Sequence, residues 1–288
     1  MPLNPLNELK RFCAALQTLC IYGALGIASF GWTLSRLLHF DCKHYVALWF
    51  YAAVFIYNLD RLKSDPADPI NMPLRSREAA RFRKTSVVAA SLSALAMVVA
   101  PVLQRDGIMI FLTICGGLIC MNYSLSPFGF RFKDIPLLKT LFAPTVITAA
   151  FLLPPFLQQR GANTLAIWII AAEWIWCVLM FNMVLCDLRD LRGDAATGIR
   201  SLPVALGLRR MLFGLAGLIV VTALLSIAAI HFSPQGTVAW RNVSATTLLY
   251  LAALFGVVCK SRKLSEAFYE WWVEGILFVP MIAYWFAR

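Results

Sequence analysis

The chain has 288 residues, of which 60% are hydrophobic and 14% are charged. A water-soluble domain cannot bury so much apolar surface, so the composition excludes a soluble globular protein and indicates an integral membrane protein. The formal net charge of +11 is typical of a membrane protein with basic loops on one side, so we expect no nucleic-acid partner. The eight cysteines lie mostly in apolar runs and lack metal-ligand spacing, so we expect them to pack as small apolar side chains.

Apolar windows long enough to cross about 30 Å of hydrocarbon recur along the whole chain. We therefore predict an all-α fold: a polytopic bundle of nine transmembrane helices that forms a single domain over residues 1–288. The short polar N-terminal stretch leads directly into the first window, so we expect a retained span and no cleaved signal peptide. The windows are 12–35, 44–60, 86–104, 107–124, 139–158, 164–187, 211–231, 243–259 and 268–287.

The basic residues predict the orientation of this bundle. With a cytoplasmic N-terminus, 20 of the 26 Lys and Arg residues fall in cytoplasmic segments. This bias follows the positive-inside rule, so we predict an N-in, C-out topology. The same orientation places the acid-rich loops after the second and sixth windows on the cytoplasmic side. We expect a multi-pass protein of the inner membrane, if the source is bacterial, with its active face toward the cytoplasm.

The first acidic cluster follows the second window, in the stretch "YNLDRLKSDPADPINMPLRSR". Asp60, Ser64 and Asp68 are spaced at i, i+4 and i+8, and Asp65 lies beside the serine. Pro66 disfavours helical geometry at Asp65, so we expect the helix to break there and continue as a loop.

The second acidic cluster ends the sixth window. Asp187, Asp190 and Asp194 stand at i, i+3 and i+7, so a continuing helix would place all three on one face. Carboxylates in this arrangement suit a hard cation such as Mg²⁺ that also binds substrate phosphates. Arg192 and Arg200 are nearby candidates for phosphate binding. Mixed Asp and Arg residues also occur as solvated helix ends with weak ion pairs, but two such clusters on one side weigh against that alternative.

Two glutamates are further candidates for the same cavity. Glu173 lies in the middle of the sixth window, fourteen residues before Asp187 and on roughly the same helix face. An ionisable group at that depth is a functional candidate, although a neutral structural group is an equal alternative. Glu274 lies near the cytoplasmic start of the ninth window, where solvation of a helix entry is the simpler interpretation.

These motifs resemble those of the UbiA superfamily of intramembrane prenyltransferases, and the resemblance covers nearly the whole chain. The second cluster and its tail "GIRSLPVALG" match the family's Asp-x-x-Asp-x-x-x-Asp motif and the segment that follows it. The first cluster matches less closely: "DPINMPLR" fits the family's tail and makes Asp68 the last acid, but Ser64 then stands where an aspartate is expected. Asn58 and Asp65 are out of frame with that motif, and Asp65 is a replacement for the missing carboxylate.

The resemblance implies a prenyl diphosphate donor, two Mg²⁺ ions and an acceptor that captures the allylic cation. It implies that the aspartates of both clusters bind metal, that all of them except Asp65 are catalytic, and that a further set of residues binds the diphosphate. The aspartates are Asp60, Asp65, Asp68, Asp187, Asp190 and Asp194. The diphosphate-binding residues are Asn58, Tyr123, Arg131, Lys133, Lys139, Arg192 and Arg200.

Three functions remain open at this point. The first is transfer of an isoprenyl group to a small aromatic or ring-bearing acceptor, with release of pyrophosphate. The second is a terpene cyclase on the same scaffold, and the third is a membrane transporter whose acids line an ion path. The clustering of acids at one mouth of the bundle argues against the transporter. The sequence does not indicate the acceptor, the prenyl chain length or the oligomeric state.

Overall fold

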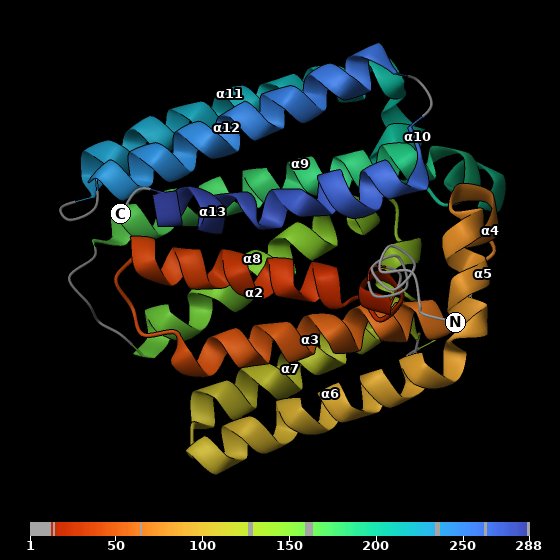
Figure 1. The fold of residues 1–288 in the computed structure, drawn as a ribbon, viewed down its shortest axis with the longest axis horizontal. Coiled ribbons are helices and arrows are strands. Elements are labelled where there is room, and N and C mark those ends of the chain that lie inside the picture. Colours follow the sequence, from red (N-terminus) through yellow and green to blue (C-terminus); the bar gives the residue numbers. More distant parts are fainter. Residues whose placement is uncertain are drawn as a thin grey trace, which may run out of the picture.

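The computed structural model describes residues 13, 15–63, 65–125, 129–158, 164–233, 237–261 and 264–286, and the regular elements in these ranges are all helical. Long helices run roughly side by side, and the short helices α4, α5 and α10 gather at one end of the bundle (Figure 1). The long helices are α2 (Ile21–Leu37), α3 (Lys43–Leu62), α6 (Arg83–Gln104), α7 (Gly107–Ser124), α8 (Leu138–Gln158), α9 (Leu165–Thr197), α11 (Leu208–Phe232) and α12 (Thr237–Lys260). The shorter elements are α4 (Asp68–Asn71), α5 (Pro73–Arg81), η1 (Phe132–Asp134), α10 (Leu202–Leu206), η2 (Phe268–Val273), η3 (Glu274–Leu277) and α13 (Val279–Phe286).

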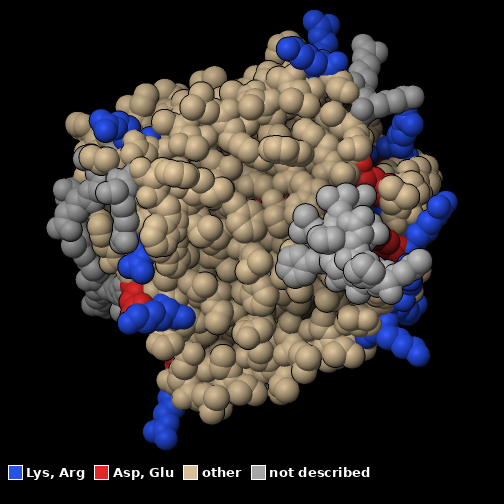
Figure 2. All heavy atoms as spheres, in the orientation of Figure 1, with Lys and Arg blue, Asp and Glu red and all other residues tan. Residues whose placement is uncertain are grey.

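Five helices of the described chain are long and apolar enough to cross a membrane, namely α6, α8, α9, α11 and α12. Their outer faces expose large apolar side chains, such as Leu92 and Leu95 on α6 and Leu224 and Ile227 on α11. Figure 2 shows a broad face of mainly uncharged side chains between two ends that carry the charges. An exposed apolar surface of this extent is expected to contact lipid, and the chain therefore has the features of an integral membrane protein.

Helix α9 is the centre of the bundle and carries the second acidic cluster. It continues to Thr197, ten residues past the predicted end of the sixth window, and ends at Gly198, whose φ of 79° suits a left-handed C-cap. Trp174, Phe181 and Leu185 on α9 are fully buried, because α8 and α11 pack against it. Since the helix is unbroken from Leu165, the three predicted aspartates lie on one helix as their spacing required.

The C-terminal span differs from the prediction of one regular helix over 268–287. Residues Phe268–Val273 form a π-helix, Glu274–Leu277 a 3-10 helix, and only Val279–Phe286 are α-helical. The prediction of a regular helix was wrong because apolar periodicity does not reveal hydrogen bonds from neighbouring helices to the backbone of this segment.

Candidate active site

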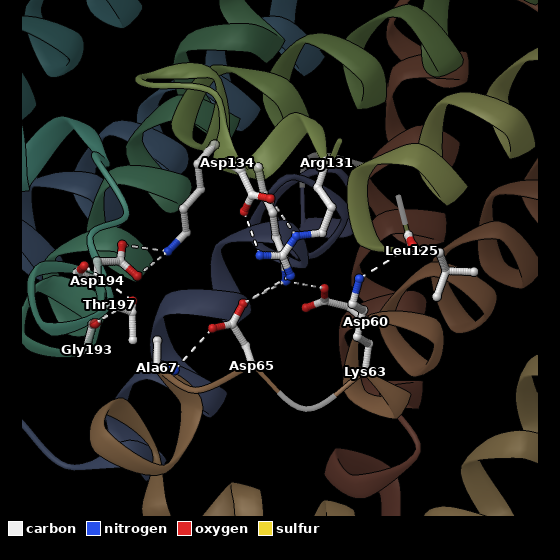
Figure 3. A network of polar contacts seen from close by, with 12 residues as sticks. Asp60, Lys63, Asp65, Ala67, Leu125, Arg131, Asp134, Gly193, Asp194 and Thr197 are labelled. Atoms are coloured by element: carbon white, nitrogen blue, oxygen red, sulfur yellow. Dashed lines mark hydrogen bonds and ion pairs between the residues drawn. The ribbon is translucent and has the colours of Figure 1, made fainter. Parts of the chain in front are cut away.

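One cavity of about 630 Å³ brings the two acidic clusters together. The first cluster contributes Asp60 from the end of α3 together with Asp65 and Asp68, and the second contributes its aspartates from α9. Figure 3 shows Asp60 and Asp65 on one side of the network and Asp194 on the other. The rest of the lining is mainly apolar, with side chains from α3, α7 and α8. The cavity therefore has one acidic end and one apolar region.

A direct contact between α4 and α9 fixes the distance between the two clusters. The backbone N–H of Gly193 donates a 2.7 Å hydrogen bond to the Asn71 Oδ1 atom. A Cβ atom at Gly193 would lie 2.6 Å from the carbonyl oxygen of Ala67 and 2.5 Å from Asn71 Nδ2. Only glycine permits this approach, so the small residue between Asp190 and Asp194 is what allows the first cluster to dock on α9.

The carboxylates of α9 are buried and each has a cationic or hydroxyl partner. Asp187 and Asp194 are each 1% exposed. The Lys139 ammonium lies 2.6 Å from Asp194 Oδ2 and 3.8 Å from Asp187 Oδ1, and the Thr140 hydroxyl donates to Asp187. Asp190 instead accepts two hydrogen bonds from the guanidinium of its neighbour Arg189, at 2.7 and 2.9 Å. One lysine and one arginine thus compensate part of the negative charge of the three carboxylates.

The first cluster is arranged in the same way around a second lysine. Lys133 Nζ lies 3.1 Å from Asp60 and 3.2 Å from Asp65, and Asp65 also accepts the Ala67 N–H at 3.1 Å. Burial and these two carboxylates act in opposite directions on Lys133, and the carboxylates prevail and raise the pKa of its ammonium. Burial likewise opposes ionisation of Asp65, but the Ala67 hydrogen bond and Lys133 outweigh it and lower the pKa of Asp65. Burial raises the pKa of Asp68, and the charge of Arg75 offsets this effect only in part.

A short segment between α7 and α8 positions both lysines. Lys133 lies in η1 and Lys139 in the first turn of α8. Leu137, which has a φ of 67°, donates its N–H to the carbonyl of Arg200 at 3.0 Å, and Thr140 Oγ1 accepts the Leu202 N–H at 3.2 Å. The segment is therefore attached to the chain that follows α9, and one lysine faces each acidic cluster.

Several predicted site residues lie in or near the cavity, and others do not. Tyr123 lines it and stacks on Phe142 with ring centroids 4.6 Å apart. Glu274 also lines the cavity. Arg131 pairs with Asp134 at 2.6 Å and lies 3.6 Å from Asp65, so it adds a positive charge beside the first cluster (Figure 3). Ser64 lies outside the described residues.

The structure places Asn58 and the two arginines after Asp190 away from the lining of this cavity. Asn58 is fully buried and its amide donates to the carbonyls of Leu19 and Val54, so it joins α3 to the chain before α2. Arg192 is exposed, because two residues after Asp190 the helix has turned by about 200°. Arg200 is exposed, because it follows the helix C-cap at Gly198.

Glu173 is also outside the cavity. It lies about 21 Å along the axis of α9 from Asp187, at 1.5 Å per residue, and it lines a separate hollow of about 650 Å³ with Thr145 and Trp176. Glu173 and Asp187 lie on roughly the same helix face, but this axial distance places them in separate hollows.

The lining of the cavity also contains polar residues that were not among the predicted site residues. The arginines and the asparagine nearest the acidic clusters are Arg61, Asn71, Arg75 and Arg189. Arg75 lies in the first turn of α5, where its N–H and that of Leu74 donate to the Glu266 carboxylate at 3.0 and 3.1 Å. Asn71 and Arg75 belong to the "DPINMPLR" tail, which was a sequence signal for them, whereas no local pattern distinguished Arg61 or Arg189 from loop arginines.

The donor set suits Mg²⁺ in one particular mode. Among the residues that the structure describes, no three His, Cys, Asp or Glu side chains lie close enough to bind one metal ion together. Mg²⁺ is commonly bound by one or two carboxylates, with waters and substrate phosphates completing its octahedron. Pairs of carboxylates from each cluster fit that mode, and hard oxygen donors are what this ion prefers.

The fold and the cavity thus define a helical protein with the features of an integral membrane protein and a cavity with one end rich in charged side chains. The chain belongs to the UbiA prenyltransferase family, whose model matches residues 71–278, and this confirms the resemblance seen in the sequence. The match begins at Asn71, after the aspartates of the irregular first cluster.

Two curated relatives are similar to parts of the chain. The digeranylgeranylglyceryl phosphate synthase of Methanopyrus kandleri is 26% identical over 136 residues, which are 45% of this chain and 47% of that protein. The protein of the same name from Natronomonas pharaonis is 42% identical over 50 residues, which are 17% of this chain and 18% of that protein. The matched regions therefore span less than half the length of either relative.

The fold is also similar to solved structures. A UbiA homologue from Archaeoglobus fulgidus bound to GPP and Mg²⁺ matches with a TM-score of 0.62 at 14% identity, covering 95% of this chain and 99% of that one. The same homologue bound to DMAPP and Mg²⁺ gives a TM-score of 0.59 at 15% identity, covering 94% and 98%. At this level of identity the likeness establishes the fold.

Proposed function

We propose that the chain is a Mg²⁺-dependent prenyltransferase that moves an isoprenyl group from a prenyl diphosphate to a small acceptor and releases pyrophosphate. The observation that carries this proposal is the shared cavity, in which two acidic clusters and two lysines adjoin an apolar region. Family membership and the GPP and DMAPP bound to the A. fulgidus homologue support a prenyl diphosphate as the donor.

The acidic end would hold two ions. Two of the carboxylates of Asp187, Asp190 and Asp194 would hold one, and Asp60 with Asp65 or Asp68 the other. Bound Mg²⁺ would neutralise charge that develops on the departing diphosphate. Lys133 and Lys139 face the same space and are placed to bind diphosphate oxygens, while Tyr123 closes the wall between α7 and α8.

The apolar region would hold the isoprenyl chain and exclude water. Trp49, Phe111, Phe151 and Leu153 line it, on α3, α7 and α8. Water would capture the allylic cation that forms when the C–O bond breaks. An apolar lining that excludes water from this part of the cavity therefore favours transfer over hydrolysis. The active end would face the cytoplasm, in the inner membrane of a bacterial source, since the basic loops lie at this end.

The acceptor is proposed to carry a nucleophilic hydroxyl group. A ring-bearing phenol and a glyceryl phosphate both meet this description. The names of the two curated relatives describe a glyceryl phosphate that carries two geranylgeranyl groups, which favours the second class.

Purified protein in detergent, supplied with Mg²⁺ and prenyl diphosphates of several chain lengths, tests the proposal. Pyrophosphate release that depends on an added hydroxyl acceptor supports a transferase. Release without acceptor, with a hydrocarbon product, indicates a cyclase instead. Complete lack of release with every chain length contradicts both enzymes and favours the transporter.

A further inference from the structure

The irregular segment before α13 is held in place by side chains of several neighbouring elements. Four consecutive carbonyl groups, from Glu270 to Val273, each accept a hydrogen bond from a distant side chain. The donors are Gln17 to Glu270 at 3.0 Å, Tyr22 to Trp271 at 3.0 Å, Tyr250 to Trp272 at 2.7 Å and Asn182 to Val273 at 2.8 Å. Because these bonds replace or supplement the regular helical ladder, the π and 3-10 geometry is a specified feature of the fold.

The residue that follows these four carbonyls is Glu274, and its side chain faces the cavity. A Cβ atom at Gly23 would lie 3.1 Å from Glu274 Oε2 and 3.2 Å from Tyr57 Cε2. The absence of a side chain at position 23 therefore lets the carboxylate and the tyrosine ring lie against α2. Within the described chain, no hydrogen bond or ion pair to the Glu274 carboxylate is present.

Three arginines of the cavity, Arg75, Arg61 and Arg189, act on Glu274 through their charge without a direct ion pair to it in the described chain. Arg61 donates to the carbonyls of Gln17 and Thr18 at 2.7 and 2.6 Å, and Arg189 is paired with Asp190. An ionisable group inside a membrane protein that is aimed into a cavity without a partner is a functional candidate.

Glu274 lies closer to the middle of the bundle than the acidic clusters do. Its neighbour Val273 is bonded to Asn182, which precedes Asp187 by five residues, or about 7.5 Å along α9 toward the middle of the bundle. A diphosphate bound by Lys133 and Lys139 would direct its prenyl chain toward the apolar region, past the level of Glu274. In that pose the Glu274 carboxylate would lie beside the first carbons of the chain.

We propose that Glu274 takes the proton from the acceptor's nucleophilic hydroxyl group, an inference that rests on the proposed function. The bond between the first prenyl carbon and the diphosphate oxygen breaks, and the electron pair leaves with the diphosphate. The acceptor oxygen bonds to that carbon, and its proton passes to the Glu274 carboxylate. The proton returns to water when the ether product leaves, so no further reactant is needed.

The test compares Glu274→Gln with the matched control Glu270→Gln. Glu270 belongs to the same segment, but it does not line the cavity. Geranyl diphosphate is the donor, and a monoalkylglyceryl phosphate with a free hydroxyl group and 4-hydroxybenzoate are the acceptor probes. Three quantities are measured: ether product, binding of a non-hydrolysable geranyl thiodiphosphate with Mg²⁺, and the pH dependence of transfer.

Glu274→Gln should lower the transfer rate by about 100-fold or more, the usual contribution of a general base, with binding of the thiodiphosphate within twofold of the unaltered protein. At saturating Mg²⁺, the unaltered protein and Glu270→Gln should both lose transfer as the pH falls, since the base must be ionised. The residual rate of Glu274→Gln should fall less steeply, because only the metal-binding carboxylates still titrate. Formate should restore part of the rate of Glu274→Ala.

Transfer by Glu274→Gln at more than half the unaltered rate overturns the inference. So does a parallel loss of thiodiphosphate binding, which would indicate damage to the donor site. If the unaltered protein releases no pyrophosphate at all, the proposed function itself fails, and this outcome is distinct from a defect confined to Glu274→Gln.

Discussion

Gly193→Ala is expected to separate the two acidic clusters while leaving the bundle folded. The added Cβ would lie 2.6 Å from the Ala67 carbonyl oxygen, whereas ordinary contacts begin near 3.4 Å. Helix α4 must therefore move by about 0.8 Å. A shift of this size in the position of catalytic groups has a large effect on the reaction rate. The movement lengthens the 2.7 Å bond between Gly193 N–H and Asn71. Loss of this bond costs about 1 kcal/mol and overpacking about 1–3 kcal/mol, against a gain of about 1 kcal/mol from alanine in a helix.

The net effect on stability is thus a loss of about 1–3 kcal/mol, which the fold tolerates. Catalysis is more sensitive, because a misplacement near 1 Å costs on the order of 100-fold in rate. Mg²⁺-dependent pyrophosphate release and thermal unfolding in detergent measure the two effects separately. The control is Gly217→Ala on α11, where a Cβ would meet no atom within 4 Å. Unaltered release by Gly193→Ala would refute the idea that this contact sets the geometry of the site.

Three further changes probe the charged groups. Asp187→Ala should abolish turnover with the protein still folded and inserted, because Lys139 keeps its 2.6 Å contact with Asp194; a rate near that of the unaltered protein would exclude Asp187 as a metal ligand. Lys139→Met should lower stability by about 3–5 kcal/mol, since it leaves Asp194 buried without its cation, and MgCl₂ should raise the unfolding midpoint of this variant more than that of the unaltered protein. The lowered pKa of Asp65 means that its contribution to stability is present above its unfolded pKa near 4 and is lost as the pH falls through the folded value. Asp65→Asn should therefore reduce the loss of unfolding free energy at acidic pH. If this loss is unchanged in the variant, the ion pair between Asp65 and Lys133 does not stabilise the fold.

The sequence predicted those parts of the site that depend on local periodicity. Asp187, Asp190 and Asp194 share α9 because a spacing of i, i+3 and i+7 follows the helical repeat. Pro66 predicted the break after α3, and the chain does leave the helix before Asp65. The sequence predicted that the acid-rich loops lie on one side of the bundle, and the short helices α4, α5 and α10 do gather at one end (Figure 1).

Features that depend on contacts between distant segments were beyond such reasoning. Arg192 was expected to bind phosphate because it stands among the aspartates in sequence, yet it is exposed and Arg189 lines the cavity instead. Asn58 resembled a motif residue but serves as a donor to two backbone carbonyls. The change from π-helix to 3-10 helix at Glu274 depends on hydrogen bonds from Tyr22, Asn182 and other residues far away in the sequence. The apolar pattern of this segment does not indicate those donors.

The distribution of these distant contacts has a physical reason. Helices in lipid gain little from hydrophobic association, because the lipid chains are as apolar as the side chains they replace. A membrane protein that must hold two clusters of carboxylates at a set distance therefore needs directional bonds at that end of the bundle. The bonds from Gly193 to Asn71, Leu137 to Arg200 and Leu202 to Thr140 are of this kind. Each joins a segment that carries charged groups of the cavity to α9 or to the chain that follows it, so α9 serves as the common reference for both clusters and both lysines. This arrangement explains why a change at Gly193, which has no side chain to contact a substrate, is expected to affect the rate more than the stability.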